Sequence, residues 1–292
     1  MLSGKIYKVL AGTYYIMTDV GKVEAKAKGS FRNDNTVPKV GDNVLLEQQA
    51  GSYRIKNVCP RKNELTRPPV ANIDKLVIVM AVRKPEPDFV LAEKLIFSCR
   101  MNCIEPIIVI NKSDIDNESA AKLASEMVQS GAKTICVSAK NNVGINDLMN
   151  ELKGYTSSFA GQSAVGKSSI ATHLLSGLTL NIGGLSKKTD RGKHTTRCCE
   201  LYCFDNDSFI VDTPGFSLFD EELISPEDFV RNFDDAYCEL SKKCRFRGCS
   251  HTNEPDCAVM DAVQNGELSE QRYSRYCKLY KIILEKWRNR YD

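Results

Sequence analysis

The sequence predicts a multidomain protein with a small N-terminal β-barrel, a central α/β region and a mostly helical C-terminal region that binds metal. Short strands separated by Gly, Asn and Asp turns fill the first 67 residues. Strands and amphipathic helices then alternate, as in a parallel sheet covered by helices. Three cysteines and a histidine finally gather within 14 residues. We therefore divide the chain into domains at residues 1–67, 68–220 and 221–292.

The N-terminal region favours a barrel of the OB type. Five short strands are expected there, at Lys5–Leu10, Tyr14–Thr18, Val23–Lys28, Asn43–Glu47 and Tyr53–Val58. Residues 1–67 hold twelve Lys and Arg against six Asp and Glu, whereas the other two regions are slightly acidic. OB barrels bind nucleic acid through loops and one face, so the charge favours an RNA partner. A basic solvated surface on a packing module is the alternative. Arg67-Pro68-Pro69 is the expected linker.

A phosphate-binding loop lies in the central region. Residues 161–168 read GQSAVGKS and fit the pattern G-x-x-x-x-G-K-[ST], in which backbone N–H groups surround phosphates. A strand at 155–160 precedes the loop, and a helix at 169–175 would direct its positive N-terminus at the phosphates. Lys167 would reach the β- and γ-phosphates in a catalytic role, and Ser168 would bind Mg²⁺. The residues predicted to hold the phosphates are Gly161, Gln162, Ser163, Ala164, Val165, Gly166, Lys167, Ser168 and Ser169.

A second phosphate-sensing motif, Asp212-Thr213-Pro214-Gly215, follows an apolar strand at 209–211. Asp212 would hold Mg²⁺, and the Gly215 N–H would sense the γ-phosphate. Thr195 or Thr196, in the polar stretch between the two motifs, would complete the Mg²⁺ shell, and the sequence leaves that choice open.

The residue that would position the attacking water is not evident. Many GTPases place Gln directly after Asp-x-x-Gly for this purpose, but this chain has Phe216 there. His194 is the candidate catalytic residue because it precedes the two threonines. An ordinary solvated side chain is the alternative.

Two further motifs predict recognition of guanine. Asn111-Lys112-Ser113-Asp114 and Ser138-Ala139-Lys140 each end an expected strand. Asp114 can accept hydrogen bonds from guanine N1–H and N2–H₂, and adenine has no donors at those positions, so a dry site of this kind rejects adenine strongly. Asn111 and Lys112 would brace the pocket, and a backbone N–H of residues 138–140 would meet guanine O6. The chain is therefore expected to bind GTP, GDP and Mg²⁺.

The order of these motifs is the most specific feature of the sequence. In an ordinary GTPase the phosphate loop comes first and Asn-Lys-x-Asp comes near the end. Here the base-reading motifs, at 111–114 and 138–140, precede the phosphate-reading motifs, at 161–168 and 212–215. The order predicts a circularly permuted P-loop GTPase.

The C-terminal cluster predicts one structural Zn²⁺ ion. Three thiolates and one imidazole suit a closed tetrahedral site, with the ligands Cys244, Cys249, His251 and Cys257. The chain has twelve cysteines and neither a signal peptide nor a membrane span, which favours a reducing cytoplasm and free thiols elsewhere.

Helices are expected at 226–240 and 268–288. The second is basic and would contact RNA or form a solvated face, through Arg272, Arg275, Lys278, Lys281, Lys286, Arg288 and Arg290.

With these motifs in place, the chain resembles the ribosome small subunit-dependent GTPase A family over nearly its whole length. The family's loop typically reads G-x-S-G-V-G-K-S, so Ala164 stands in place of a glycine. The resemblance implies a cytoplasmic, monomeric protein that binds the small (30S) ribosomal subunit and its 16S rRNA and assists late maturation. Hydrolysis would be stimulated by the subunit and would time release. The alternative is a GTP-gated RNA-binding regulator with negligible turnover, which Phe216 leaves open.

Overall fold

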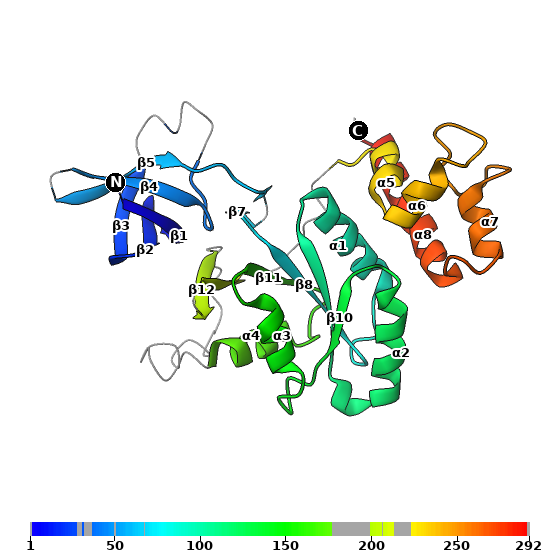
Figure 1. The fold of residues 1–292 in the computed structure, drawn as a ribbon, viewed down its shortest axis with the longest axis horizontal. Helices are drawn as coiled ribbons and strands as arrows, with labels where there is room; N and C mark the ends of the chain where they lie inside the picture. Colours follow the sequence, from blue (N-terminus) through cyan, green and yellow to red (C-terminus); the bar gives the residue numbers. More distant parts are fainter. Residues whose placement is uncertain are drawn as a thin grey trace.

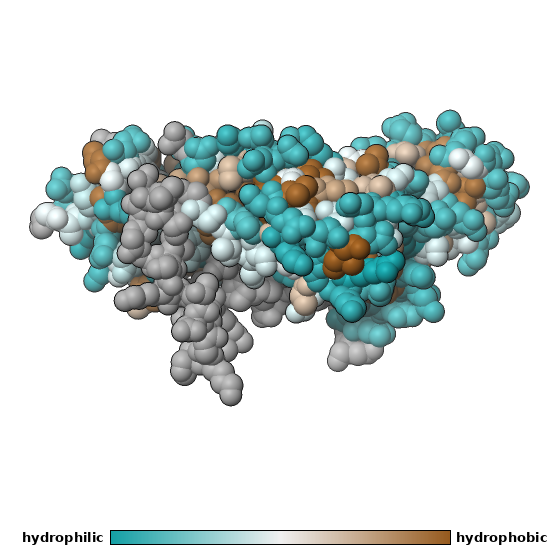
Figure 2. Space-filling view, turned by 90° about the horizontal axis from the view of Figure 1, so that it is seen from below, coloured by the Kyte–Doolittle hydropathy of each residue, from teal (hydrophilic) through white to brown (hydrophobic). Residues whose placement is uncertain are grey.

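The computed structural model describes residues 2–27, 31, 37–49, 51–66, 68–176, 199–205, 207–212 and 223–290, without the side chain of Asp212. The barrel and the helical C-terminal region lie on opposite sides of the central α/β region (Figure 1). One face of the molecule is mostly hydrophilic with small separate hydrophobic patches (Figure 2). No helix among the described residues has the length and apolar character needed to cross a membrane.

Five strands form the N-terminal barrel, as predicted. Strand β1 pairs with β2 and β4, β2 with β3, and β3 and β4 with β5, so the pairing closes on itself. Alternate residues point inward and build a core of Ile6, Tyr14, Ile16, Ala25, Val44, Leu46 and Ile55. The bounds differ from the prediction by up to three residues: β1 Leu2–Leu10, β2 Thr13–Thr18, β3 Gly21–Ala27, β4 Asn43–Gln49 and β5 Ser52–Val58.

Six strands form the central sheet in the order β10-β9-β8-β11-β13-β12, all parallel except β12. They are β8 Lys75–Ala81, β9 Glu105–Asn111, β10 Lys133–Cys136, β11 Thr156–Ala160, β12 Glu200–Asp205 and β13 Ser208–Asp212. Every residue of β8 is buried because helices cover both faces. Helices α1 (Phe89–Met101) and α2 (Asn117–Val128) contribute to one core, and α3 (Ile145–Leu152) and α4 (Lys167–Ser176) to the other.

The chain enters this sheet in the middle. It forms β8, β9 and β10 toward one edge and then returns to β11 on the other side of β8. The pair β8–β11 is therefore the point where the strand order reverses, and ligands of open α/β sheets bind at the carboxyl ends of strands at such a point. The phosphate loop follows β11 at this position.

The barrel and the central sheet meet along β1 and β12. Lys8 and Glu200 are register partners, and their side chains form an ion pair of 3.2 Å. The pairing makes one sheet that continues into the barrel and covers the edge of β12.

Pro68 and Pro69 of the expected linker at residues 67–69 lie within a folded segment. Strands β6 (Glu64–Leu65) and β7 (Val70–Ala71) form a hairpin, and Leu65, Val70 and Ile73 are buried. Pro68 and Pro69 belong to the turn of this hairpin rather than to an extended connection. The domain boundaries at residues 67 and 220 remain predictions.

Four helices build the described C-terminal region: α5 Pro226–Asn232, α6 Asp235–Ser241, α7 Ala258–Gln264 and α8 Glu270–Arg288. The single helix predicted at 226–240 is two helices, because Asp234 adopts an extended conformation and its side chain caps Ala236 N at 2.8 Å. Aromatic rings fill the core. Phe97 of α1 packs edge-on against Phe229, with ring centroids 5.0 Å apart, so the core extends into the central region.

A buried charge cluster joins α8 to α1. Glu93 is 1% exposed and accepts from Arg272 Nε at 3.2 Å and from Arg275 Nη1 at 3.3 Å. Arg272 also donates to Asp234 at 2.8 Å. The prediction that Arg272 and Arg275 belong to an RNA-facing or solvated helix face is therefore wrong, because both guanidinium groups are buried in ion pairs.

Candidate functional site

Glycine is required at both ends of the phosphate loop. Gly161 has a φ of +127°, and a Cβ there would lie 2.2 Å from the Val79 carbonyl oxygen. Gly166 has a φ of +100°, and its Cβ would lie 2.2 Å from Asn111 Nδ2. No side chain fits either space, so the loop packs directly against β8 and against the base-reading motif.

Ala164, between these glycines, also has a left-handed backbone, with a φ of +63°. An L-residue with a Cβ pays about 1 kcal/mol for this conformation. The loop therefore holds Ala164 in a backbone conformation that favours glycine, and it does so with strain.

The Lys167 ammonium lies over the phosphate loop. It donates to the carbonyls of Gly161 at 2.8 Å and Gln162 at 2.5 Å. Burial lowers the pKa of Lys167, because it disfavours the charged ammonium. A bound phosphate could replace the two carbonyls as the partner of this ammonium, and its negative charge would favour the charged form again. Ser168 and Ser169 are exposed in the first turn of α4, where the N-terminus of a helix favours anions.

Asn111 connects the base-reading motif to the phosphate loop. Its Nδ2 donates to the Val165 carbonyl at 2.8 Å, and its Oδ1 accepts from the Ala139 N–H at 3.1 Å. The Lys112 ammonium also reaches the loop and donates to the Ala164 carbonyl at 2.9 Å. The side chains of Asn111 and Lys112 thus connect the loop after β9 to the phosphate loop, and Asn111 also connects it to the loop after β10.

Asp114 is exposed at the mouth of this arrangement, and Ser138 orients it. The Ser138 hydroxyl donates to Asp114 Oδ1 at 2.5 Å and accepts from the Asn141 N–H at 3.2 Å. Ser113 is buried, and its N–H donates to the Val137 carbonyl at 3.1 Å. An acceptor held in this way suits the two donors on one edge of guanine. Lys140 is exposed beside it.

Several predicted site residues lie outside the described part of the chain. These are the candidate catalytic residue, the threonines of the Mg²⁺ shell and the γ-phosphate sensor: His194, Thr195, Thr196 and Gly215. The backbone of Asp212 ends β13, beside β11, at the same sheet edge as the phosphate loop. The roles assigned to these residues remain predictions.

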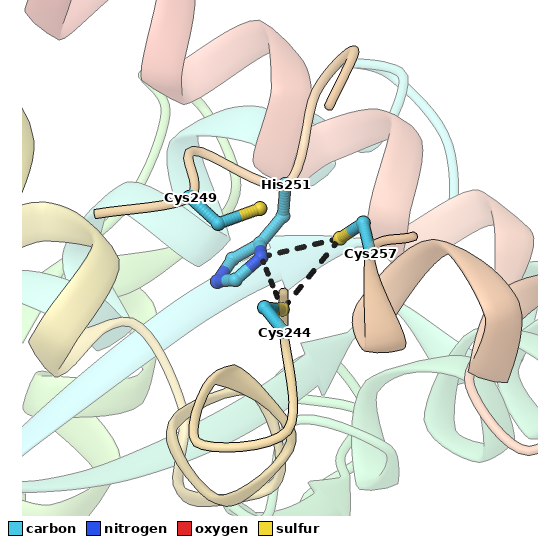
Figure 3. A group of neighbouring side chains, drawn as sticks. All are labelled: Cys244, Cys249, His251 and Cys257. Atoms are coloured by element: carbon cyan, nitrogen blue, oxygen red, sulfur yellow. Dashed lines mark hydrogen bonds between the residues drawn. The ribbon is translucent and has the colours of Figure 1, made fainter. Parts of the chain in front are cut away.

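The four predicted zinc ligands point toward one another (Figure 3). Their ligand atoms all lie within 4.8 Å of one another. The Cys244 and Cys257 sulfurs are 3.9 Å apart, and His251 Nδ1 lies 3.6 Å and 3.4 Å from them. Tetrahedral zinc with bonds of about 2.3 Å to sulfur and 2.0–2.1 Å to nitrogen places its ligand atoms roughly 3.5–3.8 Å apart. The donor set and its spacing therefore fit Zn²⁺.

Neighbouring groups fix the tautomer and position of His251. Its Nε2 lies 2.7 Å from the Ser241 hydroxyl, which donates to the Tyr237 carbonyl at 2.8 Å. The hydroxyl is thereby left to accept from Nε2–H, so Nδ1 is free to bind metal. Tyr273 and Tyr276 donate to the carbonyls of His251 and Ser250 at 2.8 Å and 2.7 Å.

Sequence reasoning missed Ser241 and both tyrosines. Each lies outside the Cys-His motif in the sequence, and only the folded structure places it beside the zinc ligands. Burial raises the pKa of the Cys249 thiol to about 12 and lowers the pKa of His251, so this pocket disfavours charge without a cation. Every described cysteine is a free thiol.

Comparison with known proteins identifies two regions of the chain. Residues 58–222 match the family described as RsgA GTPase, and residues 3–53 match the RsgA N-terminal domain. The chain is 41% identical to the small ribosomal subunit biogenesis GTPase RsgA of Caldanaerobacter subterraneus subsp. tengcongensis, over 99% of this chain and 98% of the relative. The RsgA of Ruminiclostridium cellulolyticum is 36% identical over 97% and 94%.

Two solved structures share the whole architecture. YjeQ from Thermotoga maritima aligns with a TM-score of 0.81 at 33% identity, over 97% of this chain and 98% of that one. YloQ, described as a circularly permuted GTPase, aligns with a TM-score of 0.79 at 30% identity, over 98% and 96%. The permuted order and the predicted enzyme class, a GTP hydrolase, are thereby confirmed. This chain belongs to the RsgA GTPase family.

Proposed function

We propose that this protein is a GTPase that binds the small (30S) ribosomal subunit through its 16S rRNA and assists its late maturation as a monomer in the cytoplasm. The subunit stimulates GTP hydrolysis, and hydrolysis times release. The observation that carries this proposal is the assembled nucleotide site in a chain whose full-length relatives are named small ribosomal subunit biogenesis GTPases.

Guanine selection depends on Asp114. Its carboxylate, oriented by the Ser138 hydroxyl, accepts the two donors of guanine, and the Ala139 and Lys140 backbone lies beside O6. Asn111 and Lys112 hold this pocket against the phosphate loop by hydrogen bonds to its carbonyls.

Phosphate transfer to water depends on the loop and on Lys167. The ammonium neutralises charge on the transferring phosphate, and the loop N–H groups hold it in line. Ser168, Asp212 and either Thr195 or Thr196 would hold Mg²⁺, which neutralises further charge when bound. His194 positions the attacking water, since Phe216 has no group that can.

The RNA-contacting surface of the barrel is narrower than its composition suggests. Lys39 and Arg61 pair with Glu64, and Lys62 pairs with Asp74, so these cations are engaged within the molecule. Lys26 and Arg54 are exposed and face each other across β3 and β5 as register partners. We assign the phosphate contacts of the barrel to this pair, with Lys22 and Lys56 on the same strands.

Two connections between the GTPase region and its neighbours support the proposal that the bound nucleotide times release from the subunit. Strand β12 follows the stretch that holds His194 and pairs with the barrel through Lys8 and Glu200. Strand β13 leads through Gly215 toward α5. Each flanking region is thus connected to a segment predicted to sense the γ-phosphate, so hydrolysis relaxes both and lowers affinity for the subunit.

The test is phosphate release from GTP with and without purified small subunits. Turnover is expected to rise by at least about tenfold, well below the largest stimulations that activating partners give other GTPases. Large subunits serve as the matched control and leave turnover unchanged. Equal turnover in all three conditions would favour the GTP-gated regulator, provided that the protein still binds small subunits.

A further inference from the structure

The segment that carries the zinc ligand His251 and leads to Cys257, which we call the histidine loop (residues 250–256), is sharply bent at two points. His251 has a φ of +60° and Asp256 a φ of +54°, in the left-handed region that residues other than glycine rarely adopt. Such residues persist only where the surrounding structure holds them. His251 is fully buried, so the direction of its Nδ1 depends on the backbone that carries it. The contacts that hold this loop therefore affect the metal site.

The carboxylate of Glu254 binds the N–H groups of this loop. Its Oε1 accepts from the Ser250 N–H at 2.8 Å and from the Ser250 hydroxyl at 2.6 Å. Its Oε2 accepts from the Thr252 N–H at 3.1 Å and from the Asn253 N–H at 3.2 Å. Hydrogen bonds to a charged acceptor are about twice as strong as neutral ones. Glu254 thus ties the residues on both sides of His251 to a single group.

Glu254 has no competing role among the described residues. It is not one of the four groups placed to hold the metal, and the described part of the chain shows no ion pair for it. The carbonyls of the same loop are held separately, because Tyr276 donates to Ser250 at 2.7 Å and Tyr273 donates to His251 at 2.8 Å. Helix α8 therefore fixes the carbonyl groups around the ligand, and Glu254 fixes the N–H groups.

We propose that Glu254 is a positioning residue of the zinc site, and that its carboxylate holds His251 Nδ1 toward the sulfurs of Cys244 and Cys257 before the metal arrives. Nδ1 lies 3.6 Å and 3.4 Å from these two sulfurs (Figure 3). A ligand that is already ordered loses less conformational freedom on binding, so the affinity for metal rises. Residues that orient a metal ligand typically contribute roughly 10–100-fold to metal affinity. The inference goes beyond the proposed function and does not depend on it.

The first experiment measures the zinc affinity of the full-length protein by competition with a chromophoric chelator. Glu254→Gln keeps the shape of the side chain but replaces one acceptor oxygen by an NH₂ group, which cannot accept from the loop N–H groups. Its zinc affinity is expected to fall by roughly 10–100-fold. Asp256→Asn is the matched control, because it removes a negative charge from the same loop. The Asp256 side chain pairs with the exposed Arg245 at 2.6 Å, so this variant should bind zinc as the unaltered protein does.

The second experiment replaces zinc by Co²⁺, whose visible absorption reports the geometry of its ligands. Glu254→Gln should alter the spectrum of the Co²⁺-loaded protein, because the imidazole is held less firmly, and Asp256→Asn should not. Ser250→Ala removes one of the four donors to Glu254, so its zinc affinity should fall in the same direction but by less. Its control is Thr252→Val, which loses the hydroxyl contact with Ser250 at 2.7 Å but keeps its own N–H.

Weaker zinc binding and an altered Co²⁺ spectrum in Glu254→Gln, with neither change in Asp256→Asn, support the inference. Unchanged affinity and spectrum in Glu254→Gln overturn it. Equal losses in the two variants overturn it as well, since the effect would then come from charge alone. If Glu254→Gln does not fold, Ser250→Ala is compared with Thr252→Val, and equal zinc affinities of these two variants overturn the inference. Every measurement uses the protein without subunits, so a failure of the proposed function leaves this test unaffected.

Discussion

The nucleotide site and the zinc cluster are built in opposite ways. The nucleotide site collects residues at or just beyond the ends of β9, β10, β11 and β13, and its first and last described residues are Asn111 and Asp212. The zinc cluster takes its four ligands from 14 residues. A site of the first kind depends on sheet topology and keeps its shape by long-range hydrogen bonds such as Asn111 to Val165. A site of the second kind depends on local spacing and on metal. Loss of the metal should therefore damage one region and spare the other.

The largest effect is expected from Cys249→Ser. Removal of one thiolate from a closed site abolishes tight zinc binding, which in short zinc-binding peptides supplies roughly 10–16 kcal/mol of folding free energy. Metal analysis should show less than one zinc per chain, and protease digestion should cut the C-terminal region. GTP affinity should be unchanged, and a parallel loss of GTP binding would show that the two sites are not independent.

His194→Ala tests the part of the nucleotide site that the structure does not describe. GTP affinity is expected to stay near that of the unaltered protein, while stimulated turnover falls by roughly 10²–10⁴, as for other groups that act on the water. His173 in α4 is the control, because His173→Ala should leave turnover unchanged. Full activity of His194→Ala on small subunits would assign water positioning to another group.

Asp114→Asn should exchange preference for GTP for preference for XTP. Asparagine can donate to the xanthine C2 carbonyl, where aspartate only accepts, and a mismatch of donors in such a site typically costs on the order of 10²-fold or more. Competition binding with both nucleotides measures the change. Ser138→Ala should weaken GTP binding without inverting the preference, since it only frees the Asp114 carboxylate. A GTP-preferring Asp114→Asn protein would contradict the assignment.

Lys26→Gln combined with Arg54→Gln should reduce the salt slope of subunit binding by about 1.4–1.8, one phosphate for each cation. The structure favours this pair over removal of residues 1–67, because that deletion would also expose the edge of β12. Lys62→Gln is the matched control, since Lys62 already pairs with Asp74 at 2.6 Å. An unaltered slope would show that the barrel contacts the subunit through another surface.

The smallest effect is expected from Ala164→Gly. Relief of the left-handed strain raises the free energy of unfolding by about 1 kcal/mol or less, because glycine also gains entropy in the unfolded chain. Ala121→Gly, at an exposed position inside α2, should instead lower it by about 1 kcal/mol. Thermal unfolding of the two variants should therefore shift in opposite directions, and shifts of the same sign would contradict the strain at Ala164.

Local patterns predicted the barrel, the strands of the sheet other than β12 and the C-terminal ligand cluster. The alternation in β2 and the apolar run of β8 are properties of consecutive residues, so they can be read from the chain. The phosphate loop and the Asn-Lys-x-Asp motif are likewise short. Their meeting at one sheet edge could be predicted because parallel strands place their carboxyl ends together.

What could not be predicted depends on distant partners or on balanced local preferences. Nothing near Arg272 indicates that its charge is cancelled by Glu93, 179 residues away. The hairpin that contains Pro68 resembles a linker in composition. It is part of the folded structure because Leu65 and Val70 are buried. Helix α7 is only seven residues long and directly follows the zinc ligand Cys257. Its pattern of apolar residues is too short to distinguish a helix from other local structure.

The buried cluster of Glu93, Arg272 and Arg275 constrains how these three positions can change during evolution. Loss of the carboxylate alone would remove the counter-charge that both guanidinium groups share away from water and leave them only Asp234 and Glu126, which is more costly than replacement of all three by apolar residues. The three positions, 179 and 182 residues apart, therefore form one evolutionary unit. Among relatives they should change together or not at all, and a chimera that combines the central region of one relative with the C-terminal region of another should fold only when these residues match.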